Sequence, residues 1–200
     1  QQVLVEQFEA SLLLAGGSRP HELLPYLSKS ELDWTRARAT PTDERWVPAD
    51  APKSNLAMLC TGLAKAQWLD PRQGQNPLAA AQVWGQQLRD WLPFSAVLLG
   101  MGEDGHIASL FPDMPGLAAA LDITQPPVAL LGQAPDAPQT RLSLNLSMLL
   151  NTRWLGLLVF GQRKAELLEQ ALADTPESRV WPVHALLHQQ RMPANIYWAP

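Results

Sequence analysis

The residues best suited to chemistry lie in one short polar run that follows an apolar stretch at residues 94–99. The run reads GMGEDGH and ends at His106, close to Asp104 and Glu103. An imidazole titrates near neutral pH, so it can take a proton from an attacking water molecule. Asp104 or Glu103 would orient the ring or hold substrate hydroxyls. A histidine at an ordinary helix start is the alternative, but His106 is the leading candidate for a general base.

An earlier glycine turn indicates an anion-binding site. Gly16 and Gly17 end an apolar run, and Ser18 follows where we expect a helix to begin, with Ser18 as its cap. Backbone N–H groups and a hydroxyl at a helix N-terminus suit a phosphate group. The same sequence also suits an ordinary capped helix.

Two cations are candidates for holding the same anion. Arg45 lies in the polar segment 41–50 beside Asp43 and Glu44, and its forked donors match a phosphate group well. A local ion pair with those two acids is the alternative. Lys164 lies three residues after a glycine, in the first turn of an expected helix. A cation there opposes the helix dipole unless an anion is nearby, although a solvated lysine is equally compatible.

Several well-known catalytic patterns are missing from the sequence. Ser109 is not flanked by the glycines of a GxSxG nucleophile turn, which argues against a serine hydrolase. Residues 16–20 lack the GxxxxGK[ST] pattern, and the run at 100–105 carries two acids where a dinucleotide pyrophosphate would lie. These absences favour acid–base chemistry on a small phosphorylated molecule.

The remaining histidines and the single cysteine do not indicate a metal centre. Cys60 and the four histidines have no spacing typical of zinc ligands. We interpret His21, His184 and His188 as structural or surface residues, because they lie in expected helices without polar clusters. The sequence therefore predicts no metal site.

The elements that must position these residues alternate between strands and helices. Strands are expected at residues 10–15, 36–40, 94–99, 154–160 and 195–198, with an edge strand near 128–131. Helices are expected after Ser18 and at residues 55–66, 78–92 and 164–172. A strand end and a short helix are expected within residues 141–151. This alternation predicts an α/β fold with a mainly parallel sheet flanked by helices. Ligands bind outside the carboxyl ends of such strands, so the glycine turns should share one site. No boundary is evident, which predicts one domain over residues 1–200.

Composition narrows the class of protein. The chain has 200 residues, 46% of them hydrophobic and 17% charged, which is enough apolar material for a core. Lys and Arg number 15 against 19 Asp and Glu, a net charge of −4 that argues against a nucleic-acid partner. No apolar run is long enough to cross a membrane, and no export signal is visible. We therefore expect a cytoplasmic protein.

Four motifs, taken together, resemble those of the 6-phosphogluconolactonase family. The run LGMGEDGHIASLFP at residues 99–112 resembles its signature, and TDERWVP at 42–48, followed by SN at 54–55, is similar to a second motif. AGGSRP at 15–20 and GxxK at 161–164 are similar to its first and last motifs. The four occur in the family order.

The resemblance implies a Rossmann-like fold shared with glucosamine-6-phosphate deaminases and ribose-5-phosphate isomerases, and hydrolysis of a phosphorylated sugar lactone in the pentose phosphate pathway. It implies that His106 activates water and that no metal or organic cofactor takes part. It implies that Gly17, Ser18, Arg45 and Lys164 hold the phosphate and that Asp43 and Asp104 shape the hydroxyl side of the site. Gly16 and Gly105 are also expected to bind the substrate. We expect a monomer or a small homo-oligomer.

Two other functions remain open at this point. A sugar-phosphate isomerase or deaminase on the same fold would resemble the pattern GxGxNGH, whereas the residue before Gly105 here is Asp104. A non-catalytic sugar-phosphate sensor would usually be joined to a DNA-binding module, and this chain has no basic patch for one.

Overall fold

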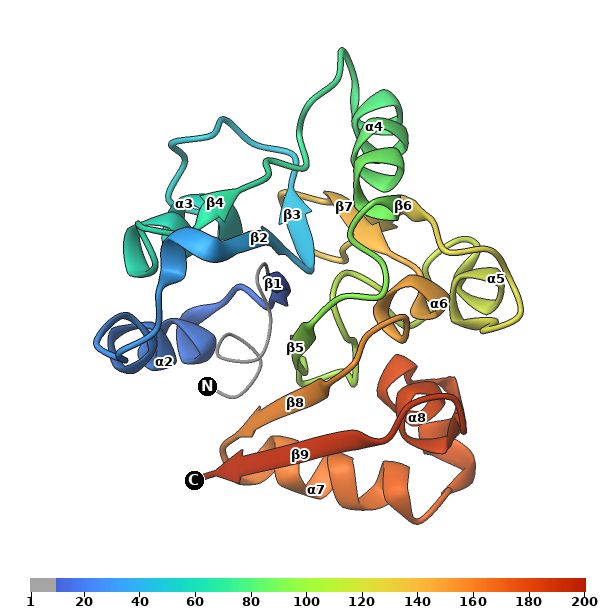
Figure 1. Cartoon of the computed structure of the whole chain (residues 1–200). Helices are drawn as coiled ribbons and strands as arrows, with labels where there is room; N and C mark the ends of the chain where they lie inside the picture. The colour runs from blue at the N-terminus through green and yellow to red at the C-terminus, as the bar shows by residue number, and fades with distance from the viewer. Residues whose placement is uncertain (1–9) are drawn as a thin grey trace.

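A six-stranded parallel sheet forms the centre of the molecule (Figure 1). The computed structural model describes residues 10–200, apart from the side chains of residues 18–21. In the order in which they lie in the sheet, the strands are β4 (Gln67–Trp68), β2 (Ala37–Pro41), β1 (Ala10–Leu14), β5 (Ala96–Gly100), β8 (Leu155–Phe160) and β9 (Ala194–Ala199). All neighbouring strands in this sheet pair in parallel, which confirms the predicted α/β class.

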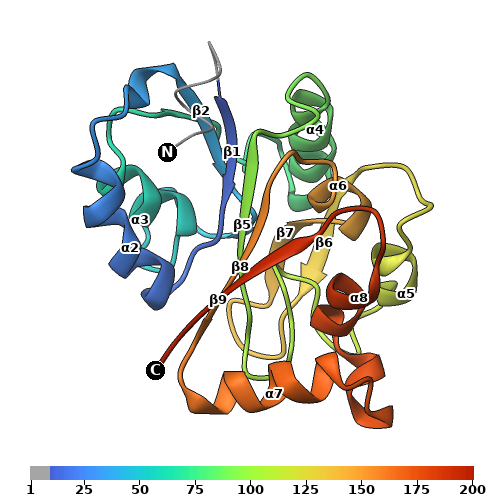
Figure 2. The same cartoon turned by 60° about the horizontal axis from the view of Figure 1, so that its bottom comes forward.

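Helices cover both faces of this sheet (Figure 2). The helices are α2 (Ser18–Ser28), α3 (Asn55–Gly62), α4 (Pro77–Arg89), α5 (Leu117–Leu121), α6 (Leu146–Leu149), α7 (Gln162–Leu172) and α8 (Pro182–His188). Alternation along β1 divides the core, because successive side chains of a strand point to opposite faces. Leu12 and Leu14 pack with Leu59 of α3, whereas Leu13 packs with Trp84 of α4. The helices predicted at residues 55–66, 78–92 and 164–172 are confirmed, each with small differences in its bounds.

A smaller antiparallel sheet adjoins the large one. It consists of β3 (Asp43–Arg45), β7 (Thr140–Leu144) and β6 (Ala129–Gln133), with β7 in the middle. β6 confirms the edge strand expected near residues 128–131. β3 begins two residues after the end of β2, so the chain passes from one sheet to the other at Thr42. The sequence pattern did not predict β3, because its three polar residues lack the alternation that marks a strand.

Among the described residues, no helix is both long and apolar enough to cross a membrane. Two short 3₁₀ helices complete the structure, at Trp34–Arg36 (η1) and Pro176–Val180 (η2).

Candidate active site

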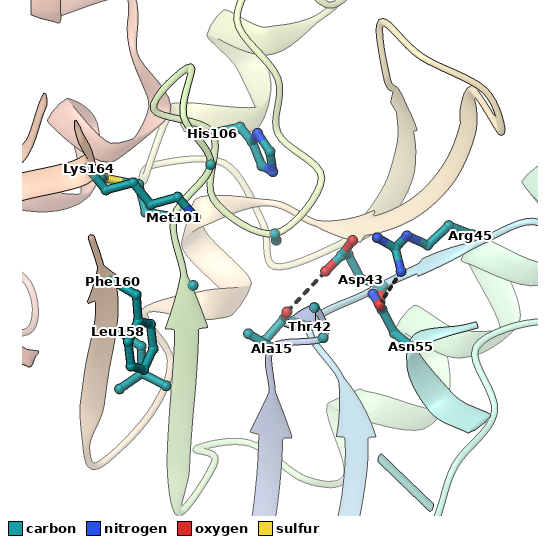
Figure 3. A pocket seen from close by; sticks show the side chains of 15 residues that line it. Ala15, Thr42, Asp43, Arg45, Asn55, Met101, His106, Leu158, Phe160 and Lys164 are labelled. Atoms are coloured by element: carbon teal, nitrogen blue, oxygen red, sulfur yellow. Dashed lines mark hydrogen bonds between the residues drawn. The ribbon is translucent and has the colours of Figure 1, made fainter. Parts of the chain in front are cut away.

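A pocket of about 220 Å³ opens at the carboxyl ends of β1, β2, β5 and β8. This is where ligands bind in open parallel sheets, and the small volume suits a metabolite better than a dinucleotide. Six predicted site residues line it: Gly16, Gly17, Asp43, Arg45, His106 and Lys164. Figure 3 shows Lys164 and Arg45 on opposite sides of the pocket, with His106 and Asp43 between them.

His106 is held by a carboxylate from its own loop. Its Nδ1 lies 2.6 Å from Oδ1 of Asp104, and its backbone N–H donates to the same oxygen at 3.1 Å. A carboxylate only accepts hydrogen bonds, so the neutral ring carries its proton on Nδ1 and leaves the Nε2 lone pair free. The ring also packs against Phe111, with a centroid distance of 4.4 Å. The side chain is 30% exposed, which leaves room for water to reach the ring.

Asp104 remains a carboxylate over a wide pH range. Partial burial raises its pKa, but the hydrogen bonds and charge of His106 lower the pKa more, so the net shift is downward. Asp104 lies in a neighbouring hollow that His106 shares, together with Glu103 and Arg141. It can therefore orient the imidazole without lying in the main pocket.

Glycines give the catalytic loop its shape. A Cβ at Gly102 would lie 2.1 Å from Nδ1 of His106, so only glycine permits this approach of ring and backbone. Gly105 has φ of +77°, and a Cβ there would lie 2.8 Å from the side chain of Trp181. Its carbonyl accepts a hydrogen bond from the N–H of Val183, at the start of α8. The structure thus places Gly105 behind the main pocket rather than among its lining residues.

Asp43 is a buried carboxylate at the junction of the two sheets. Its Oδ2 accepts a 2.6 Å hydrogen bond from Ser109, and its Oδ1 accepts one of 3.2 Å from Thr42. These hydroxyls fix the carboxylate in the pocket wall. A fixed carboxylate is a good acceptor for the hydroxyl groups of a sugar.

Arg45 reaches the pocket from β3. One terminal nitrogen donates to Oδ1 of Asn55 at 2.5 Å and to the carbonyl of Lys53 at 2.9 Å, and these bonds fix the guanidinium. The other N–H groups of the guanidinium can still donate to a ligand. Arg141 is the cross-strand partner of Arg45. Burial lowers the pKa of Arg141 and the charge of Arg45 lowers it further, while Asp43 raises it. Two opposed guanidinium groups favour an anion beside them.

Lys164 lies in the first turn of α7, as predicted. Gly161 is the N-cap of this helix, with φ of +84°. Within the described part of the chain, no carboxylate forms a salt bridge with Lys164. Its ammonium group and the N-terminus of α7 therefore present positive charge to the same side of the pocket.

The first glycine turn differs in one respect from the prediction. Gly17, with φ of 107°, is the N-cap of α2, and Ser18 is the first residue of the helix, so the expected capping role of Ser18 is wrong. The side chain of Ser18 lies outside the described part of the structure. Gly16 packs closely on Asn55, because a Cβ there would lie 2.0 Å from its Oδ1.

Sequence reasoning missed several residues of the site. The pocket is also lined by Ala15, Thr42, Asn55, Met101, Leu158 and Phe160. Ala15, Thr42, Asn55 and Met101 lie within the motifs that resemble the family, but they were not singled out as site residues. Leu158 and Phe160 belong to an apolar strand, where no pattern distinguished them from core residues. The interpretation of His184 as lacking a polar cluster is also wrong, because its Nε2 lies 2.8 Å from Oδ1 of Asp174.

Comparisons with known proteins identify the family to which the chain belongs. The family model for glucosamine-6-phosphate isomerases/6-phosphogluconolactonase matches residues 1–198. The chain belongs to this family. A 6-phosphogluconolactonase from Pseudomonas putida is 37% identical over 96% of this chain and 80% of the relative, and one from Pseudomonas aeruginosa is 38% identical over 98% and 84%.

Solved structures of the family share the fold. A 6-phosphogluconolactonase from Shewanella baltica superposes with a TM-score of 0.88 at 33% identity, covering 99% of this chain and 87% of that one. A monomeric glucosamine-6-phosphate deaminase has a TM-score of 0.75 at 18% identity, covering 98% and 88%, which shows a common fold.

Proposed function

We propose that this protein hydrolyses 6-phospho-D-glucono-1,5-lactone to 6-phosphogluconate, a step of the pentose phosphate pathway. The observation that carries the proposal is the placement of His106, oriented by Asp104 from a neighbouring hollow, in a pocket flanked by Arg45 and Lys164. A general base and two cations that face one small pocket match a substrate that carries both a reactive carbonyl and a phosphate group.

In the proposed mechanism, His106 acts as general base. Its free Nε2 takes a proton from water while the water oxygen bonds to the lactone carbonyl carbon, giving a tetrahedral oxyanion. The oxyanion then collapses and breaks the bond between that carbon and the ring oxygen. The ring oxygen leaves as a hydroxyl and receives the proton from the imidazolium. A lactone is already an activated ester, so no covalent nucleophile is needed, and base assistance typically contributes about 10²–10⁴-fold.

The other site residues bind and orient the substrate in this proposal. Arg45 and Lys164 bind the phosphate together with backbone N–H groups at Gly16 and Gly17, and Ser18 belongs to the same turn. Asp43 accepts hydrogen bonds from sugar hydroxyls. Binding the remote phosphate holds the ring in position for attack, which converts binding energy into rate. Backbone N–H groups of the loop at residues 100–106, or a nearby cation, would stabilise the oxyanion.

The proposal also covers the domain organisation, cellular location and cofactor requirement of the protein. We expect one domain over residues 1–200 that works in the cytoplasm as a monomer or small homo-oligomer. We expect it to need no metal or organic cofactor and no nucleic-acid partner.

The test is lactone hydrolysis with the substrate generated in place and spontaneous ring opening subtracted. Wild-type protein should accelerate acid release, and His106→Ala should lose most of this activity while keeping its folded circular dichroism spectrum. Full activity in the variant would refute the base assignment but not the reaction. If neither protein accelerates hydrolysis, assays for ammonia release from glucosamine-6-phosphate and for sugar-phosphate isomerisation would identify the alternative enzymes. Ligand binding without any turnover would identify a sensor.

A further inference from the structure

A cluster of metal-binding side chains lies where α7 and α8 pack together, away from the candidate active site. His184 and His188 are one turn apart on α8, and Asp174 follows the end of α7. One donor atom from each residue lies within 4.8 Å of the other two, and none of the three lines the pocket of His106. We propose that Asp174, His184 and His188 form a binding site for a transition-metal dication, with Zn²⁺ as its occupant.

The hydrogen bond of His188 supports a metal-binding tautomer. Its Nε2 lies 2.8 Å from the carbonyl oxygen of Ala171. A carbonyl oxygen only accepts, so Nε2 carries the proton and Nδ1 keeps the lone pair. Imidazoles that bind metals in proteins usually donate their other N–H to such a carbonyl or to a carboxylate. The ring is also stacked on that of His184, with a centroid distance of 4.2 Å and an interplanar angle of 27°. The two side chains are therefore close, and one ring must rotate for both nitrogen lone pairs to point at a single ion.

The Asp174–His184 pair has nearly the separation that a zinc ion requires. Nε2 of His184 lies 2.8 Å from Oδ1 of Asp174, a carboxylate that only accepts, so this nitrogen carries the ring proton in the metal-free protein. A metal ion would replace that proton, and the neutral ring would then be protonated on Nδ1. Two ligand atoms at about 2.0–2.2 Å from a tetrahedral zinc ion lie about 3.4 Å apart, so the pair must open by only about half an ångström. Two nitrogens and one carboxylate oxygen suit zinc, whereas Mg²⁺ and Ca²⁺ prefer oxygen ligands alone. A water molecule would take the fourth position.

Arg179 competes with a metal ion for Asp174. Its Nε donates to Oδ1 at 2.8 Å and its Nη2 donates to Oδ2 at 2.9 Å. The side chains of Arg179 and Asp174 are 59% and 45% exposed, so the ion pair is solvated and opens at little cost. Oδ2 can keep its bond to Arg179 while Oδ1 turns toward the metal. The guanidinium nevertheless repels a dication, so its removal should strengthen metal binding.

The experiment is calorimetric titration of the full chain, stripped with EDTA and free of any histidine tag, with ZnCl₂. Wild-type protein should bind one ion with a dissociation constant of about 10 μM or lower. His184→Asn, His188→Asn and Asp174→Asn should each weaken binding about tenfold or more. Arg179→Gln should tighten it by about two- to fivefold, the effect expected for loss of an exposed ion pair.

His106→Asn is the matched control, because it removes a histidine of the active site and should leave zinc affinity unchanged. Co²⁺ replaces Zn²⁺ in a parallel titration, where visible absorption bands report nitrogen and oxygen ligation. Absence of saturable binding, or equal binding by the His184→Asn/His188→Asn double variant, would overturn the proposal. So would loss of binding in His106→Asn alone, since that places the ion in the active site.

Discussion

The short contact between Nδ1 of His106 and Oδ1 of Asp104 determines which ring nitrogen is available to water. A carboxylate that remains ionised keeps the proton on Nδ1 and stabilises the imidazolium formed during the reaction. Because the net shift of the Asp104 pKa is downward, Asp104 is still ionised at pH values where a typical aspartate becomes protonated. Protonation of Asp104 should therefore not contribute to a loss of activity at mildly acidic pH.

Asp104→Asn tests this arrangement. The variant should lower kcat by roughly 10–10³-fold, because an amide neither fixes the tautomer nor stabilises the imidazolium. Steady-state rates near neutral pH provide the measurement, with the circular dichroism spectrum as a check of folding. An unchanged kcat would show that Asp104 does not act through His106.

Arg45 and Lys164 should affect binding more than chemistry. Arg45→Ala or Lys164→Ala should raise KM for the phosphorylated lactone about 10- to 100-fold, because each removes charge-assisted hydrogen bonds to the phosphate. The same variants should act on unphosphorylated gluconolactone almost as well as wild type does. Lys53→Ala is a matched control, since Lys53 donates to the carbonyl of Ala137 and does not line the pocket. If the variants lost as much activity on the unphosphorylated lactone as on the phosphorylated one, Arg45 and Lys164 would not bind the phosphate.

At the scale of elements, Glu44 joins β3 to α3. Its side chain is fully buried, and it accepts hydrogen bonds from the backbone N–H groups of Asn55 and Leu56 at 2.8 and 2.7 Å. It also accepts from the hydroxyl of Ser54 at 3.0 Å and from the N–H of Arg45 at 2.7 Å. A negative charge at the start of a helix is favourable, and this one also fixes the backbone on both sides of the Arg45–Asn55 contact.

Glu44→Gln should therefore weaken both folding and binding. The amide NH₂ would face backbone donors that need an acceptor, which should lower the free energy of unfolding by about 2–4 kcal/mol. KM for the phosphorylated lactone should rise as Arg45 loses its fixed position. Urea unfolding and steady-state kinetics measure the two effects. Glu169→Gln, at an exposed position of α7, should change stability by less than about 0.5 kcal/mol. If Glu44→Gln left both the free energy of unfolding and KM unchanged, the buried charge would be dispensable.

The sequence predicted β1, β5 and β8 well because these strands are short apolar runs that end in glycine turns. The residues of β1 are all buried, and those of β5 and β8 are buried or partly buried, which requires hydrophobic runs of this kind. β3 escaped prediction because its polar residues pair with β7, about 100 residues later, a contact that local pattern does not encode. Long separations in the sequence likewise hid the hydrogen bond from Ser109 to Asp43, which are 66 residues apart, and the pairing of Arg45 with Arg141.

At the scale of the whole molecule, the pocket depends on segments from most of the chain. β1 leads to the first glycine turn, and β2 leads through Thr42 to β3. β5 leads to the loop of His106, and β8 leads to Lys164. α8 supports the loop from outside, through the hydrogen bond from Val183 to Gly105. A ligand that contacts all these segments binds only the folded chain, so it must stabilise the molecule as a whole.

The product 6-phosphogluconate should therefore raise the melting temperature. At a concentration of about 100 times its dissociation constant, the product adds about 2.7 kcal/mol, which corresponds to roughly 5–10 °C for a chain of this length. Differential scanning calorimetry should show this shift in wild type and in His106→Asn, because the general base contributes little to holding the product. Lys164→Ala should lose most of the shift, since it lacks a cation for the phosphate. A shift that survives in Lys164→Ala but disappears in His106→Asn would reverse the two roles, with the phosphate bound at the His106 loop and water activated elsewhere.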